Sequence, residues 1–201
     1  MADYRMEGIC KIGGGEFGSM TVDGVGTCTG DIKAESIRIN GVFKCQGAVE
    51  AGTIKSDGTA DFDSNIRAGK INVDGVLNAK GDAKIEAEEI VCNGVIRAEE
   101  ISADMIRADG VINAKEITGD NISINSCAHL FAKFFLKRFS HIDLIEATRI
   151  ELNGVVAKTV NGKDVRIGPS CEIENLDCSG TLFIDKKSNV KNLTGEYTMS
   201  N

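Results

Sequence analysis

One six-residue motif recurs at a nearly constant spacing and constrains the fold of this chain more than any other feature. Each copy contains an Asp-Gly or Asn-Gly pair at its fourth and fifth positions. The copies lie about 17 residues apart, except for a longer gap before the last one, and they begin at Met20, Ile37, Ile54, Ile71, Ile90, Ile106 and Ile150. A fixed period is typical of a solenoid, in which each repeat stacks on its neighbours. A period this short holds strands and turns but no pair of helices. We therefore expect an all-β solenoid.

Each repeat predicts three short strands separated by three corners. Apolar side chains alternate with polar ones along residues 71–87, with inward pairs at Ile71 and Val73, Leu77 and Ala79, and Ile85 and Ala87. Alternation with a period of two places these side chains on one face of a strand. The intervening Asp74-Gly75 pair and Gly81 favour turns, because Asx and Gly residues tolerate positive φ. Stacked three-sided turns of this kind are typical of a right-handed parallel β-helix.

Equivalent positions of successive repeats predict columns of inward side chains. Two residues after the motif glycine stand Gly26, Phe43, Ala60, Leu77, Ile96, Ile112 and Val156. Four residues after it stand Cys28, Cys45, Phe62, Ala79, Ala98 and Ala114, and a third-strand column holds Ile32, Val49, Ile66, Ile85, Ile101 and Ile117. Exchanges of large and small residues between neighbouring columns indicate that each layer conserves its volume. We expect nine or ten turns, stacked about 4.8 Å apart.

The composition fits a thin core and excludes several classes of function. Only 5% of the 201 residues are aromatic and none is Trp, which suits a solenoid better than a globular core. The net charge of −7, with no basic face repeated along the columns, argues against nucleic-acid binding. The glycines at 13–15 are not followed by Gly-Lys-Ser/Thr, so we expect no nucleotide site and no cofactor. Without an apolar leader or a long apolar run, the chain is expected to be cytoplasmic.

The cysteines predict neither disulfides nor a metal site. There are seven, at irregular positions: Cys10, Cys28, Cys45, Cys92, Cys127, Cys171 and Cys178. Cys28 and Cys45 share a column, but in-register stacking points their Cβ atoms the same way, which is poor disulfide geometry. No Cys-x-x-Cys pair occurs, and neither Cys171 nor Cys178 has a nearby His. We expect reduced thiols that fill the core.

A phenylalanine-rich segment interrupts the repeat. After a degenerate copy at Ile122, in which Ser126 replaces the glycine, the next copy is delayed to Ile150. Residues 128–149 are predicted to form an amphipathic, helical insert whose apolar side includes Ile142. It holds half of the eight phenylalanines, and its candidate contact residues are Phe131, Lys133, Phe134, Phe135, Lys137, Arg138 and Phe139. Three interpretations stay open: packing on the flank of the solenoid, binding to an anionic membrane surface, or docking of a protein partner or neighbouring subunit.

The remaining segments divide into a lead-in or cap (1–19), regular turns (20–127), C-terminal turns (150–195) and a tail (196–201). Neither end contains a convincing capping helix, and an uncapped solenoid end is a template for strand pairing with another chain. End-to-end polymerisation is therefore predicted. The candidate interface residues are Ile9, Ile12 and Phe17 at one end, and Leu182, Phe183 and Ile184 at the other.

These features together resemble the bactofilins, a family of bacterial polymer-forming cytoskeletal proteins. The resemblance rests on the glycine-punctuated turns from Met20 to Val156, and on the segments Gly13-Gly-Gly-Glu-Phe-Gly, Gly24-Val-Gly-Thr-Cys-Thr-Gly-Asp-Ile and Val165-Arg-Ile-Gly-Pro-Ser. It implies a right-handed β-helix that assembles into non-polar filaments without nucleotide. It also implies a scaffold role at the inner face of the membrane or for cell-envelope proteins. The chain lacks the Pro-rich tails common in that family, so we expect the phenylalanine-rich insert to take over their targeting role.

The sequence also bears on two other classes of function, an enzyme and a monomeric adaptor. Left-handed acyltransferases have turns of similar length, but the inward residues here do not follow a six-residue rhythm, and the regular turns contain no His for catalysis. We expect no enzymatic activity. A monomeric adaptor, which would bind a partner through its flat faces or the insert, is the stronger alternative to a filament.

Overall fold

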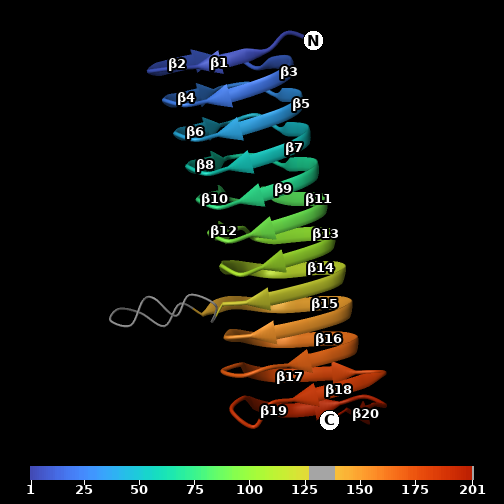
Figure 1. Cartoon of the computed structure of the whole chain (residues 1–201). Coiled ribbons are helices and arrows are strands. Elements are labelled where there is room, and N and C mark those ends of the chain that lie inside the picture. The colour runs from blue at the N-terminus through green and yellow to red at the C-terminus, as the bar shows by residue number, and fades with distance from the viewer. Residues whose placement is uncertain (127–138, 201) are drawn as a thin grey trace, which may run out of the picture.

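The chain coils into one long parallel β-solenoid. The computed structural model describes residues 1–126 and 139–200, in which twenty strands form one sheet that winds from the N-terminus to the C-terminus (Figure 1). Every strand pairing is parallel, and the coil makes about 11 turns. The predicted fold class is confirmed, with slightly more turns than expected because the first turn already begins at Tyr4. The right-handed winding stays a prediction.

Long and short strands alternate along the chain. The long strands are β3 (Gly15–Val22), β5 (Ile32–Ile39), β7 (Val49–Ser56), β9 (Ile66–Val73), β11 (Lys84–Cys92), β13 (Glu100–Ala108), β14 (Val111–Asn125), β15 (Ser140–Asn153), β16 (Val155–Ile167), β17 (Glu172–Cys178) and β19 (Asn189–Thr194). The short ones are β1 (Tyr4–Met6), β2 (Ile9–Ile12), β4 (Val25–Cys28), β6 (Val42–Cys45), β8 (Thr59–Phe62), β10 (Val76–Ala79), β12 (Val95–Arg97), β18 (Thr181–Ile184) and β20 (Thr198–Met199).

Each long strand of the regular turns supplies two of the three predicted sides. In β5, Ile32 and Ala34 are buried, Glu35 and Ser36 are both exposed, and burial resumes at Ile37. Two consecutive exposed residues break the alternation, so one corner of the turn lies inside the strand; Glu35 is left out of the register there, and the ladder resumes at Ser36. The three-sided turn is confirmed, although only two of its corners interrupt a strand.

The predicted columns form the core. Ile37, Ile54 and Ile71 stand in register in consecutive turns, and all are buried. At Gly26 a side chain is missing from its column, and the Met6 sulfur and the Phe43 ring occupy the space that a Cβ would need. A neighbouring layer therefore compensates for the small residue, as the volume exchanges in the sequence indicated.

The predicted place of Val156 in the core is wrong. Val155 is fully buried and stands in register with Ser140, whereas Val156 is only half-buried and pairs with His141. The corner before it is one residue shorter than the others, and Gly154 has a φ of 65° there. In this turn the inward side chain therefore comes one residue after the motif glycine, and not two residues after it as in the regular turns.

The motif glycines are required by close stacking and not by their φ angles. The sequence pattern explained these glycines by their tolerance of positive φ. That explanation is wrong, because none of the motif glycines from Gly24 to Gly110 has a positive φ. Instead, a Cβ at Gly58 would overlap the carbonyl oxygen of Gly41 in the turn before it, and Gly75 stands in the same relation to Gly58. The corners therefore stack backbone on backbone, and only glycine leaves the room.

Two residues that flank the interruption of the repeat, Ser126 and Ser140, meet at one corner of the coil. Residues 127–138 lie outside the described residues, and with them most of the predicted helical insert. Residues 140–149, which were assigned to that insert, belong to β15 instead, and Ile142 is a core residue. The Ser126 and Ser140 hydroxyls are 2.7 Å apart, and the buried Ser140 oxygen also accepts the Ile112 N–H at 2.9 Å. The coil thus continues across the interruption.

Both terminal segments are part of the coil. Residues 4–17 form the first turn, because β1 pairs with β3 and β2 pairs with β4. They are therefore not a separate lead-in. At the other end, β20 pairs with β18, so the predicted tail contributes the last strand.

We predict that Gly58→Ala lowers the free energy of unfolding by more than about 2 kcal/mol, because the new methyl group forces stacked backbones apart. The matched control is Gly13→Ala, since a Cβ at Gly13 meets no atom within 4 Å; its effect should stay within about 0.5 kcal/mol. Thermal or urea unfolding followed by circular dichroism compares the two. Equal effects would contradict the stacking explanation.

A second prediction concerns the corner at the interruption. Ser140→Ala removes the acceptor of the buried Ile112 N–H, and an unsatisfied buried donor costs about 1–3 kcal/mol. Ser123→Ala, on the outer side of β14, is the control and should have little effect on the free energy of unfolding, measured by urea unfolding.

Replacing residues 127–138 by a two-residue linker should keep the melting temperature near that of the parent, measured by circular dichroism. Unfolding of that variant would show that the corner does not close by itself.

Candidate functional site: the two open ends

Each end of the solenoid leaves a row of strands paired on one side only. At the N-terminal end, β1 and β2 pair with β3 and β4 and have no partner on their other side. At the C-terminal end, β19 and β20 pair only with β17 and β18. Within the described ranges no helix covers either end (Figure 1). Unpaired backbone N–H and C=O groups at a sheet edge are a template for another strand.

An aromatic pair lies over the core at the N-terminal end. The rings of Tyr4 and Phe17 have centroids 5.5 Å apart at an interplanar angle of 40°. Tyr4 continues the column of Met20, and Phe17 continues a column that is alanine in later turns. The Phe17 ring reaches over Gly15, which stands where Ile32 fills the next turn. The large rings thus fill a layer whose own aliphatic residue is missing.

Two of the three candidates predicted at this end belong to the end layer of the core. Ile12 and Phe17 are half-buried and pack against the core. Ile9 is not part of this layer, because its side chain is 90% exposed and stands in the same outward column as Val25 and Val42; its place in an interface stays a prediction. The alternation along β2 places Cys10 and Ile12 inward and Ile9 outward. Tyr4 completes the layer and was missed because no motif precedes it.

The candidates at the C-terminal end lie one layer too deep. Leu182 is fully buried because Met199 of β20 stacks on it, and Phe183 points outward. Ile184 is half-buried at the edge of the core. The exposed large apolar or aromatic side chains of this end are Leu193, Tyr197 and Met199, which are 37%, 38% and 58% exposed. This layer could not be predicted from the sequence, because a two-residue strand at 198–199 is too short to show the alternation of apolar and polar residues.

Charged and polar groups surround both end layers. The Arg5 guanidinium lies 2.9 Å from Glu7 and 2.7 Å from Asp23. Hydrogen bonds from Ser19 lower the pKa of the Asp3 carboxyl. At the other end, the Thr194 hydroxyl donates to Asp177 at 2.6 Å. Each open end therefore has an apolar centre and a polar rim, which is the usual arrangement of a protein interface.

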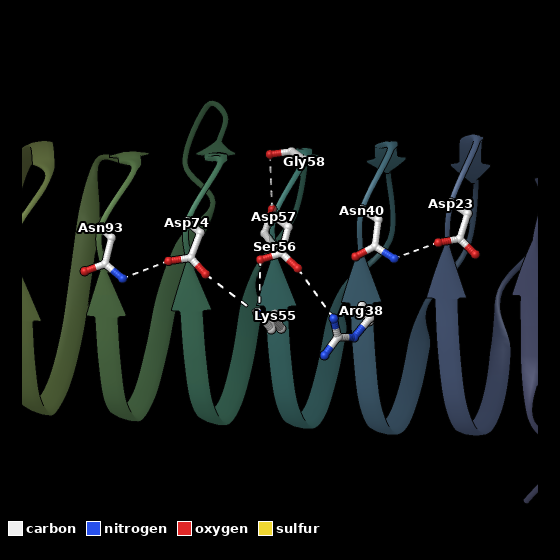
Figure 2. A network of polar contacts seen from close by, with 9 residues as sticks. All are labelled: Asp23, Arg38, Asn40, Lys55, Ser56, Asp57, Gly58, Asp74 and Asn93. Atoms are coloured by element: carbon white, nitrogen blue, oxygen red, sulfur yellow. Dashed lines mark hydrogen bonds and ion pairs between the residues drawn. The ribbon is translucent and has the colours of Figure 1, made fainter.

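A ladder of Asp and Asn side chains runs along the motif corner (Figure 2). The Asn40 amide donates to Asp23 at 2.6 Å, and the Asn93 amide donates to Asp74 at 2.8 Å. The second of these bonds lowers the pKa of the Asp74 carboxyl. Between them the cations Arg38 and Lys55 pair with Asp57 and Asp74 (Figure 2). The ladder joins turn to turn, and in the part of the chain described no three His, Cys, Asp or Glu residues form a metal cluster.

The described cysteines are core residues without disulfides. Cys28 and Cys45 are buried in register, and their sulfurs donate to the backbone oxygens of Gly30 and Gly47 at 3.1 and 3.3 Å. Burial, followed by the neighbouring Cys28, raises the pKa of Cys45 to about 12. Burial also raises the pKa of Cys92 to about 12. Thiolate, the reactive form, is therefore scarce at both positions.

The candidate membrane- or partner-binding residues fall almost entirely outside the described residues. These are Phe131, Lys133, Phe134, Phe135, Lys137 and Arg138. Phe139 is described; it is half-buried and precedes β15. No helix in residues 1–126 or 139–200 is long and apolar enough to cross a membrane.

We predict that Cys45 and Cys92 resist alkylation in the folded protein at pH 8, because thiols with a pKa near 12 stay protonated there. The half-buried Cys10 should be modified. Iodoacetamide labelling followed by peptide mass spectrometry measures each site, and all three should react after denaturation in urea. Rapid native labelling of Cys45 would contradict this protection.

The comparisons with known proteins add one partial relative. No family model matches the chain, and no solved structure matches it. The "Uncharacterized protein YhbE" of Bacillus subtilis (strain 168) is 44% identical over 52 residues, which are 26% of this chain and 22% of that protein. The chain thus covers about a fifth of the length of this relative. The chain is similar, over a quarter of its residues, to a bacterial protein whose name states no activity, and membership of the bactofilin family stays a prediction.

Proposed function

We propose that this protein is a non-enzymatic scaffold that assembles end to end into filaments without nucleotide. One observation carries the proposal: both ends of the rod have unpaired strand edges around an apolar layer. A second copy placed at either end would satisfy the backbone groups of that edge and bury its apolar centre. The resemblance to bactofilins supports the same function.

The two ends differ in chemistry, which bears on how rods would join. The N-terminal layer has the paired rings of Tyr4 and Phe17, whereas the C-terminal end exposes the aliphatic side chains of Leu193 and Met199 together with Tyr197. Non-polar filaments, which the resemblance implies, require each end to meet its own kind. Ring against ring at one junction, and flexible aliphatic chains against each other at the next, are both self-compatible contacts.

The site of action is proposed from the resemblance as well. It favours the inner face of the cell membrane and a role in recruiting cell-envelope proteins, with residues 127–138 as the segment to test for lipid or partner binding. A monomeric adaptor is the second candidate function. It is favoured by a groove lined with unpaired arginines on one face of the rod.

We predict that the double variant Ile12→Lys/Leu193→Lys stays folded and loses filaments, since each lysine sits in a solvated end layer of the single rod but would be buried unpaired at a junction. Negative-stain electron microscopy and sedimentation measure the polymer, and circular dichroism measures the fold. Val42→Lys, at an exposed apolar position two turns inside the N-terminal end, is the control and should assemble normally. Filaments formed by the double variant, or none formed by the parent protein, would overturn end-to-end assembly.

A further inference from the structure

Cations on one outer face of the rod are neutralised in the N-terminal half. Arg5, Arg38, Lys55, Arg107 and Arg166 belong to a single outward column that runs through the long strands. The first three members each reach a motif-corner aspartate in the following turn. The nitrogen–oxygen distances are 2.7 Å for Arg5 and Asp23, 3.5 Å for Arg38 and Asp57, and 3.9 Å for Lys55 and Asp74.

The same column lacks this neutralisation in the C-terminal half. The corner residue that follows Arg107 is Asn125, an uncharged amide that donates to Asp109 at 3.3 Å. The corner residue that follows Arg166 is Asp185, which accepts the backbone N–H of Lys187. Within residues 1–126 and 139–200, neither arginine has an ion pair or a hydrogen bond.

A third arginine stands beside them. Arg149 lies in the adjacent outward column and is also without an ion pair among the described residues. The guanidinium of Arg166 lies over the Phe183 ring, 4.1 Å from its centroid. Three exposed arginines therefore gather without an ion pair on an otherwise acidic protein, although Asp164 stands beside Arg149 and Glu151 beside Arg166 in the strand register. The other described arginines have carboxylate or amide partners.

The three arginines line one groove of about 600 Å³. Its floor is formed by the strands of successive turns, and its apolar side chains include Met105 and Phe183. Two carboxylates, Glu151 and Asp164, also face it; Asp164 accepts the Thr181 hydroxyl at 2.6 Å, and this bond and the Thr181 N–H lower the pKa of its carboxyl. The groove thus combines unpaired cations, acceptors and apolar contact area.

We propose that this groove binds an extended acidic peptide segment of a protein partner. Arg107 and Arg166 are three turns apart, roughly 14 Å at the usual strand spacing, so one small anion cannot reach both. The interspersed Glu151 and Asp164 would repel a polyphosphate or an anionic lipid surface, whereas a peptide offers amide and hydroxyl donors to them. Its carboxylates would receive bidentate hydrogen bonds from the arginines, and an apolar side chain would pack against Met105 or Phe183.

The probe is a fluorescein-labelled dodecapeptide of alternating Glu and Ser, measured by fluorescence anisotropy against the full chain at low and physiological salt. The test variant is R107Q/R149Q/R166Q. The matched control is R5Q/R38Q/K55Q, which removes the same number of positive charges from the same face where carboxylates already neutralise them. Melting curves verify that both variants are folded.

The expected result is binding of the Glu-Ser peptide that the test variant weakens at least tenfold and the control variant changes less than twofold. A Gln-Ser peptide should not bind. No binding of the Glu-Ser peptide, or equal losses in the two variants, would overturn the proposal. Inorganic tripolyphosphate or anionic vesicles that compete as well as the peptide would also overturn it, in favour of a general anion site. The result does not depend on whether the rods form filaments.

Discussion

The close stacking of glycine corners is the constraint on which the rest of this structure depends. At each motif corner the backbone of one turn lies directly on the backbone of the turn before, with no room for a Cβ at Gly41, Gly58 or Gly75. This contact holds the turns at the spacing of a β-ladder, and so keeps the isoleucine columns in register from layer to layer. The Asp and Asn ladder beside it follows from the same alignment, because equivalent side chains are brought within hydrogen-bond distance.

Much of this architecture could be predicted from the repeat, and the errors have physical reasons. The inward columns from Met20 to Ile117 are confirmed, with Ala98 and Ala114 only half-buried, because strand alternation and a constant period reinforce each other. Val156 was misplaced because one corner is a residue shorter. Ile142 fits both a helical and a strand pattern, and ladder pairing decided for the strand. The end layers were hardest to predict, because Ile9 and Leu182 could be placed only by knowing where the first and last strands begin.

The electrostatics of the rod divide its two halves although their fold is the same. In one half, carboxylates at the motif corners neutralise the outward cations; in the other, Asn125 stands at such a corner and the arginines face solvent. No backbone difference is needed for this change, since corner Asp and Asn residues are nearly isosteric. A uniform scaffold can therefore carry a locally distinct surface. The proposed assembly through the ends and the proposed recognition along the side would therefore use different residues.

The contact between the Ser126 and Ser140 hydroxyls bears on how the segment between them is presented on the surface of the rod. Ser126 and Ser140 meet at one corner of the coil. The register of β14 and β15 therefore does not depend on the number of residues between these two serines. We therefore expect the corner to tolerate connecting segments of different lengths without loss of register. In the proposed filament, in which like ends meet, attachment points would alternate between a shorter and a longer interval, because the corner between β14 and β15 lies nearer the C-terminal end of the rod.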